Sequence, residues 1–134
     1  MPEKQTKILI IEDDVTMREI VVHKLTTSGF AVIEAADGKS AIETWKKEKP
    51  DIVLLDLMLP EMDGFEILET MRKTKDPEMA KTSVIILSNL YSKEDIEKAK
   101  KLGIDDFMVK AYYTTEEIMT RIKDILKKKG IDKV

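Results

Sequence analysis

The sequence contains no cysteine, which excludes a disulfide framework and a thiolate metal site. A chain without cysteine is typical of a reducing compartment, so we expect a cytoplasmic location. No apolar run approaches the roughly 20 residues that a membrane-spanning helix needs. Residues 1–7 also lack the apolar stretch of a secretory signal. We therefore expect a globular protein that does not associate with a membrane.

An excess of basic residues is also missing. The chain has 23 Lys and Arg residues against 26 Asp and Glu residues, for a net charge of −3. This balance argues against nucleic acid as a ligand within this chain. The five glycines fit neither a dinucleotide-binding fingerprint nor a phosphate-binding loop. A length of 134 residues, 43% of them hydrophobic, predicts one domain over 1–134, with a core at about 7–128 and a tail or linker start at 129–134.

Four short apolar runs each end in a charged or hydroxyl residue. These are 8–11 before Glu12, 52–55 before Asp56, 84–87 before Ser88, and 107–109 before Lys110. Such runs, each followed by a helical pattern, are typical of parallel strands covered on both faces. Ligands bind beyond the carboxyl ends of such strands. We therefore expect these four polar residues to meet at one edge of a sheet.

Strand and helix patterns alternate five times along the chain. Strands are predicted at 7–11, 30–35, 52–55, 84–87 and 106–109, each followed by one of five helices. This alternation predicts an α/β fold with an open, doubly wound, five-stranded parallel sheet. The helix at 93–102 has only a thin apolar stripe, which indicates marginal local stability. Thr114 is expected to cap the last helix, with Glu117 completing a capping box.

Three carboxylates are predicted to share the site, because Glu12 and Asp13 leave one strand and Asp56 leaves another. Two unit charges about 4 Å apart repel by about 4 kcal/mol at an effective dielectric near 20. The cluster therefore needs a cation or a raised pKa, and oxygen ligands favour Mg²⁺. The alternative is that these acids are merely solvated at loop ends. The matching positions of Ser88 and Lys110 favour the metal site.

Asp56 is the predicted nucleophile, because it alone follows the most apolar of the predicted strands. An Asp carboxylate can attack phosphorus directly and form an aspartyl phosphate. Lys110 can pair with the phosphate or with the free carboxylate. Ser88 can donate a hydrogen bond to a phosphoryl oxygen and so report its presence.

Four segments resemble the receiver domain of two-component response regulators, in particular the stand-alone chemotaxis-type regulators. The segments are 8–14 (ILIIEDD), 54–64 (LLDLMLPEMDG), 86–88 (ILS) and 109–110 (VK). The resemblance runs from residue 7 to about 128, and 54–64 is its most specific part. It implies a flavodoxin-like strand order 2-1-3-4-5. It also implies that Asp56 accepts a phosphoryl group from a sensor histidine kinase or a histidine phosphotransfer protein.

The resemblance assigns roles to the other residues. Asp13 is implied as a direct Mg²⁺ ligand, Glu12 as an outer ligand, and the Met58 carbonyl as a backbone ligand beside Asp56. Ser88 and Phe107 match the switch hydroxyl and the aromatic that moves with it, and Lys110 contacts the phosphate. Pro60 and Gly64 are expected to shape the loop, with Gly64 needing a permissive backbone. Asp14 is expected to start the following helix.

Two residues depart from the family pattern. Ala111 follows Lys110 where receivers usually have a proline in a cis peptide, so we expect a trans peptide and leave the aim of Lys110 open. Phe107 lacks the hydroxyl of a tyrosine, which makes its switch less discrete. Met58 and Leu90 are expected to flank the phosphoryl group, and neither can hydrogen-bond an attacking water. We therefore predict a slowly hydrolysed phosphoaspartate.

The expected function is a phosphorylation-dependent switch that catalyses only its own phosphorylation and dephosphorylation. Its output surface is expected on the helix at 93–102, the strand at 106–109 and the last helix, where it controls a protein partner as a monomer or a phosphorylation-dependent dimer. A haloacid-dehalogenase-type phosphatase is a second class. That family needs a second acid two residues past the nucleophile, and this position is Met58 here. A pseudo-receiver that only scaffolds is a third.

Overall fold

A five-stranded parallel sheet forms the centre of the computed structural model, which describes residues 5–89 and 91–130. The strands are β1 (Lys7–Ile11), β2 (Ala31–Ala35), β3 (Ile52–Leu55), β4 (Ser83–Ser88) and β5 (Asp106–Val109). Their order in the sheet is β2-β1-β3-β4-β5, and each neighbouring pair is parallel. The predicted doubly wound sheet and its flavodoxin-like order are therefore confirmed.

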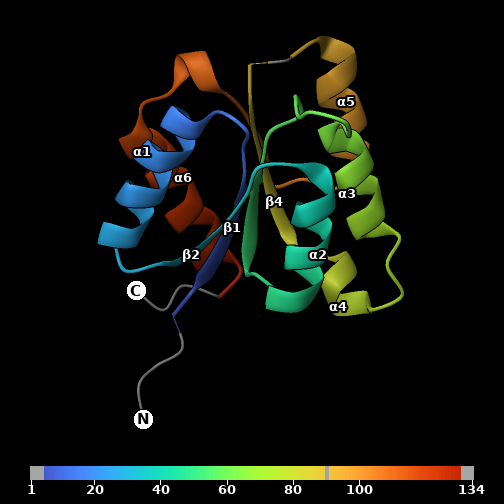
Figure 1. Ribbon diagram of the computed structural model, residues 1–134, viewed down its shortest axis with the longest axis horizontal. Coiled ribbons are helices and arrows are strands. Elements are labelled where there is room, and N and C mark those ends of the chain that lie inside the picture. The colour runs from blue at the N-terminus through green and yellow to red at the C-terminus, as the bar shows by residue number, and fades with distance from the viewer. Residues whose placement is uncertain (1–4, 90, 131–134) are drawn as a thin grey trace.

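Helices cover both faces of the sheet. They are α1 (Val15–Thr27), α2 (Gly38–Glu48), α3 (Gly64–Arg72), α4 (Pro77–Ala80), α5 (Lys93–Lys101) and α6 (Thr115–Lys128), with a 3₁₀ turn η1 (Lys110–Tyr112). Helices α1 and α6 lie on one face, and α2, α3, α4 and α5 lie on the other (Figure 1). The helices at 93–102 and at the chain end in the sequence analysis are α5 and α6.

The prediction of five helices omitted α4. Asp76 caps this single turn by accepting hydrogen bonds from the backbone N–H groups of Glu78 and Met79, and Pro77 stands at its start. Four residues are too few to show a helical apolar period, so the sequence indicates only a polar connection here.

A side-chain cap begins each of the six α-helices in residues 5–89 and 91–130. The caps are Asp14, Asp37, Asp63, Asp76, Ser92 and Thr114, and each accepts a hydrogen bond from a backbone N–H in the first turn. Thr114 and Glu117 form the predicted capping box. Because Asp14 caps α1, the acid that follows Glu12 and Asp13 has a structural role, as expected.

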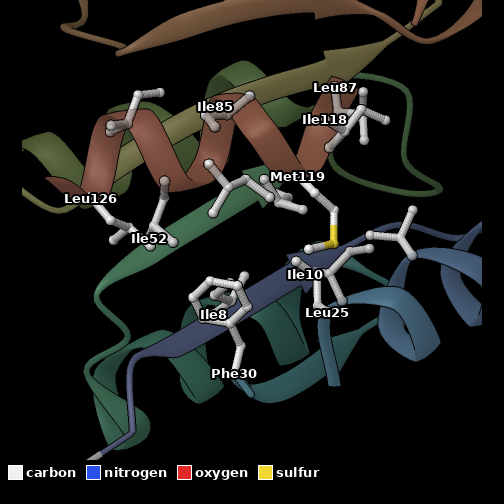
Figure 2. Close-up of a cluster of buried hydrophobic side chains, with 14 of the residues drawn as sticks. Ile8, Ile10, Leu25, Phe30, Ile52, Ile85, Leu87, Ile118, Met119 and Leu126 are labelled. Atoms are coloured by element: carbon white, nitrogen blue, oxygen red, sulfur yellow. The ribbon is translucent and has the colours of Figure 1, made fainter. Parts of the chain in front are cut away.

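Two apolar clusters sandwich the sheet, since alternate residues of each strand point to opposite faces. Ile8 and Ile10 of β1 pack with Leu25 of α1 and with Ile118 and Leu126 of α6 (Figure 2). Intervening strand residues belong to a second cluster with α2 and α3. Burial on both faces explains why the strands are unbroken apolar runs.

One apolar side chain of helix α1 is more exposed than the helical period predicts. Met17, Val21 and Leu25 recur every four residues and pack into the first cluster. Ile20 was expected on the same stripe but is 51% exposed. It lies about 100° around the helix from Val21, at the edge of the face that meets the sheet.

Strand register brings the predicted site residues to one edge. Ile11 pairs with Leu55, so the residues that follow them, Glu12 and Asp56, leave the sheet side by side. The backbone N–H of Asp56 donates to the Ile11 carbonyl over 3.1 Å and continues this pairing. Ser88 pairs with Val109, which places Lys110 one residue beyond the partner of Ser88.

Candidate phosphoryl and metal site

Three acids converge at the carboxyl edge of the sheet. Glu12, Asp13 and Asp56 each offer a carboxylate oxygen within 4.8 Å of the others. Glu12 and Asp56 are 3% and 5% exposed, whereas Asp13 is exposed to solvent. Burial raises the pKa of Glu12, and the nearby charge of Asp56 raises it further, although Lys110 acts in the opposite direction. An all-oxygen donor set of this kind, with two buried acids and one exposed acid, fits a hard divalent cation.

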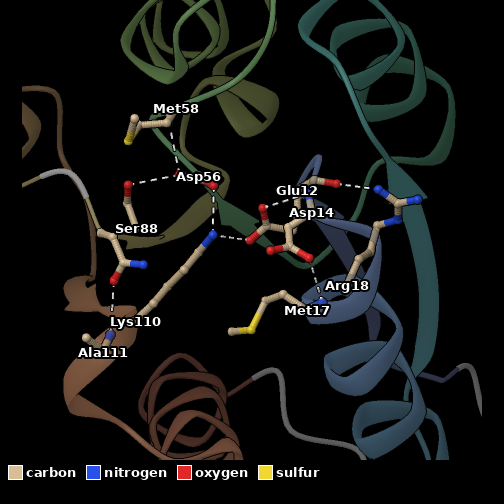
Figure 3. Close-up of polar contacts among 10 residues, drawn as sticks. Glu12, Asp14, Met17, Arg18, Asp56, Met58, Ser88, Lys110 and Ala111 are labelled. Atoms are coloured by element: carbon tan, nitrogen blue, oxygen red, sulfur yellow. Dashed lines mark hydrogen bonds and ion pairs between the residues drawn. The ribbon is translucent and has the colours of Figure 1, made fainter.

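Lys110 lies between the two buried acids (Figure 3). Its Nζ donates to Oδ2 of Asp56 over 2.8 Å and forms an ion pair with Oε1 of Glu12. Burial alone lowers the pKa of Lys110, but its bonds to the two carboxylates outweigh burial and raise it. Lys110 therefore stays charged and compensates two buried negative groups.

The second oxygen of Asp56 is occupied by neutral donors. Its Oδ1 accepts hydrogen bonds from the Ser88 hydroxyl over 2.9 Å and from the Met58 backbone N–H over 3.0 Å. With Lys110 on Oδ2, donors at the carboxyl ends of three separate strands, β3, β4 and β5, orient this carboxylate. Such an arrangement can hold a nucleophilic carboxylate in one direction and can donate to oxygens of a group attached to it.

Glu12 is fixed by contacts that the sequence did not indicate. Its Oε2 accepts a hydrogen bond from the backbone N–H of Asp14 over 3.2 Å, and Arg18 donates to its carbonyl. Arg18 also pairs with Glu34 of β2 through Nε, at 3.2 Å. The only available signal for Arg18 was its position one turn after the Asp14 cap.

Comparison with known proteins decides the family. Residues 8–123 match the model of the response regulator receiver domain. The chain belongs to this family. As a receiver, it is a phosphorylation-dependent signalling switch of a two-component system.

Curated relatives of this receiver are transcriptional regulators about twice its length. It is 35% identical over 125 residues to the probable transcriptional regulator ycf27 of Porphyridium aerugineum, and covers 50% of that protein with 93% of its own chain. It is 33% identical over 125 residues to the alkaline phosphatase synthesis transcriptional regulatory protein PhoP of Bacillus subtilis, with the same coverage. The receiver thus spans about half the length of the curated relatives that it matches.

Solved structures show the same fold. A CheY-like receiver domain protein from Methanospirillum hungatei superimposes with a TM-score of 0.87 at 24% identity, over 95% of this receiver and 98% of that chain. The receiver domain of the Francisella response regulator 1452 superimposes with a TM-score of 0.82 at 30% identity, over 92% of this receiver and 98% of that chain. A chain from the complex of CheX and CheY with BeF₃ and Mg from Borrelia burgdorferi superimposes with a TM-score of 0.79 at 27% identity, over 90% of this receiver and 88% of that chain.

Gly64 shapes the loop after Asp56 for a different reason from the one predicted. Its φ is not positive; the left-handed backbone in this loop belongs to Glu61, with φ 68°. A Cβ atom on Gly64 would lie 2.6 Å from the carbonyl oxygen of Asp56 and 2.7 Å from Cα of Leu57. The receiver therefore needs glycine here because the start of α3 packs directly on the Asp56 backbone, while Pro60 lies exposed.

Phe107 and Met58 differ in their surroundings, and of the two only Met58 has a given contact with the site, through its backbone N–H to Asp56. Phe107 is half-buried and packs against the second apolar cluster. The Met58 side chain is 57% exposed, so it stands beside Asp56 without filling the core. Leu90, which the sequence analysis pairs with Met58, lies outside the described residues.

Helix α5 of the receiver is weakly packed, as its thin apolar stripe predicts. Ala99 is its only buried residue. Its C-terminal end is tied to α3, because Arg72 donates to the carbonyls of Leu102 over 2.7 Å and Gly103 over 2.6 Å. Arg72 also donates to the Ala80 carbonyl at the end of α4.

No helix in the described part of the chain combines the length and apolar character that crossing a bilayer requires.

Proposed function

We propose that this receiver takes a phosphoryl group onto Asp56. The observation that carries the proposal is the convergence of a buried carboxylate, the Lys110 ammonium and the Ser88 hydroxyl within 3 Å contacts. In the transfer, an Asp56 oxygen bonds to phosphorus while the bond from phosphorus to a donor histidine nitrogen breaks. The electron pair of that bond remains on the imidazole, which then takes up a proton.

The acids beside Asp56 support Mg²⁺ as the cofactor. Asp13 and Asp56 would ligate the ion directly, Glu12 through water or the outer shell, and Met58 through its backbone carbonyl. The bound ion would neutralise the carboxylates against the incoming phosphoryl oxygens. The Mg in the Borrelia burgdorferi CheY complex, a structural relative, supports this choice.

After the transfer, Ser88 and Lys110 change partners. The Ser88 hydroxyl donates to a phosphoryl oxygen instead of the free Asp56 carboxylate, and Lys110 pairs with the phosphoryl charge. Phe107 follows the movement of Ser88, and the surface of α5, β5 and α6 changes as a result. That surface controls a downstream protein, either from a monomer or through a phosphorylation-dependent dimer.

The phosphoryl donor is a sensor histidine kinase or a histidine phosphotransfer protein in the cytoplasm. Residues 7–128 form the working unit, and nucleic acid is not a ligand of this part. The protein acts on itself and does not turn over external substrates. Met58 lacks the carboxyl that a haloacid-dehalogenase-type phosphatase needs two residues past its nucleophile.

Intact mass spectrometry tests this function. The purified protein is incubated with a small phosphodonor and Mg²⁺, and we expect a gain of one phosphoryl group. Asp56→Asn, which is close to isosteric, should show no gain, whereas Asp63→Asn, a cap substitution on α3, should behave as wild type. A gain on Asp56→Asn, or steady release of phosphate from phosphomonoesters, would contradict the proposal.

A further inference from the structure

Two side-chain hydrogen bonds join the loop after β4 to the turn after β5. Oδ1 of Asn89 accepts a hydrogen bond from the backbone N–H of Ala111 over 3.1 Å. The hydroxyl oxygens of Tyr91 and Tyr112 lie 2.6 Å apart, and the two rings meet edge to face with centroids 5.9 Å apart. Both bonds connect residues more than 20 positions apart in the chain, so they fix the two segments to each other.

These bonds begin where the strand pairing ends. Ser88 pairs with Val109 at the carboxyl end of β4 and β5. Asn89 follows Ser88, and Ala111 is two residues beyond Val109, so the Asn89 side chain continues the cross-strand connection past the sheet. Lys110 lies between the last paired residue and the residue that Asn89 holds.

The Asn89 bond acts directly on the peptide unit that leaves Lys110. The N–H of Ala111 and the Lys110 carbonyl belong to one planar peptide group. This peptide is trans. Holding its N–H therefore fixes the backbone rotation at Lys110, and with it the direction in which the side chain starts.

The Lys110 side chain needs such a fixed starting direction. A lysine carries four flexible methylene groups, and confining them costs conformational entropy. Yet Nζ of Lys110 contacts both Asp56 and Glu12 (Figure 3). A proline at position 111 would have no N–H for Asn89 and would disfavour the helical backbone that Lys110 adopts in η1.

We propose that Asn89 is a positioning residue for Lys110: its side-chain oxygen holds the Lys110–Ala111 peptide and so aims the ammonium at Asp56 and Glu12. The Tyr91–Tyr112 bond supports the same connection, two residues beyond Asn89 on one segment and one residue beyond Ala111 on the other. The role of this aim in phosphoryl transfer rests on the proposed function. The aim itself is a property of the unphosphorylated protein.

Trace labelling of lysine amines with acetic anhydride tests the aim, because an amine bonded to carboxylates is protected from reaction. Read by peptide mass spectrometry, labelling of Lys110 in Asn89→Ala should rise about two- to tenfold, the range that one net hydrogen bond supplies. Asn89→Asp keeps the acceptor oxygen and should leave Lys110 protected. Lys7, paired with Glu48, is the reference in the same sample.

An unchanged Lys110 rate in Asn89→Ala overturns the proposal, as does an equal rise in Asn89→Asp or a parallel rise at Lys7. A second measurement, phosphoryl uptake by intact mass, should be slower in Asn89→Ala. In a Lys110→Ala background the Asn89→Ala change should have no effect, because no ammonium remains to be aimed. If wild-type protein gains no phosphoryl group, the proposed function fails, whereas labelling still decides the role of Asn89.

Discussion

Nζ of Lys110 lies 2.8 Å from Oδ2 of Asp56, although the two residues are 54 positions apart in the chain. The same ammonium also pairs with Glu12, so one cation serves two buried anions. Removing either anion leaves the ammonium with a partner, whereas removing the cation leaves two buried carboxylates facing each other. The stability of the metal-free protein therefore depends on Lys110 more than on either acid alone.

Substitution of Lys110 by alanine should lower the free energy of unfolding by about 1–3 kcal/mol without Mg²⁺, because two buried acceptors lose their charged partner. Addition of Mg²⁺ should restore part of the loss. Urea denaturation with and without Mg²⁺ measures both effects. Lys7→Ala, which breaks a more exposed pair with Glu48, is the control and should lose about 1 kcal/mol or less. Equal losses in the two variants would contradict the expectation.

Mg²⁺ should stabilise the folded protein through Asp13. A ligand that binds only the folded state contributes about 2.7 kcal/mol at 100 times its dissociation constant. Asp13→Asn should lose most of this gain in thermal unfolding, because the site loses a carboxylate at little cost to the fold. Asp14→Asn keeps its cap on α1 and should retain the gain. A gain of equal size in Asp13→Asn would show that the ion binds elsewhere.

Gly64→Ala should lower the free energy of unfolding by about 2–3 kcal/mol, because its Cβ would meet the backbone of Asp56 and Leu57 rather than a flexible side chain. The displaced Asp56 should also take up a phosphoryl group more slowly. Chemical denaturation and intact mass measure the two effects. Glu66→Ala, at an exposed position in the same turn of α3, should change either quantity little. Wild-type stability in Gly64→Ala would contradict the close approach.

The phosphoaspartate should hydrolyse slowly, because the exposed Met58 side chain cannot hydrogen-bond an attacking water. Met58→Asn should therefore shorten the lifetime, and Met58→Leu, which stays apolar, should not. Intact mass at successive times after removal of the phosphodonor gives the rate. Decay within seconds in the purified wild-type protein would count against this prediction.

Helix α5 should exchange its amide hydrogens faster than α6, since Ala99 is its only buried residue whereas α6 buries five. Binding of a phosphoryl analogue should change exchange within Lys93–Lys101 and leave α2 unaffected. Hydrogen exchange read by mass spectrometry separates these helices. Unchanged exchange in α5 would refute its part in the output surface.

The sheet and the main site residues were predictable because a strand that is buried on both faces has an unbroken apolar run in the sequence. Each unbroken apolar run ends at the edge where ligands bind, so Glu12, Asp56, Ser88 and Lys110 were found as strand endings. The short helix α4 left no such trace, because one turn has no period. Strand order followed from family resemblance rather than from the runs themselves.

Contacts between loops were the part that the sequence could not show. The glycine at 64 was visible, but its reason, a backbone packed 2.6 Å from where its Cβ would stand, depends on how α3 docks. The bond from Ala111 to Asn89 joins residues 22 positions apart and follows no pattern. From the sequence, Ala111 therefore left the direction of the Lys110 side chain open. In the structure, the hydrogen bond from the Ala111 N–H to Asn89 constrains the backbone beside Lys110.

The bonds from Arg72 to the carbonyls of Leu102 and Gly103 have a mechanical consequence for α5. A helix fixed at its C-terminal end behaves as a lever with its fulcrum there, so its first turn travels furthest. Nine residues span roughly 13 Å, and a tilt of about 10° would carry Ser92 by roughly 2 Å. A partner that binds the first turn of α5 would therefore meet the part of this helix that such a tilt displaces most.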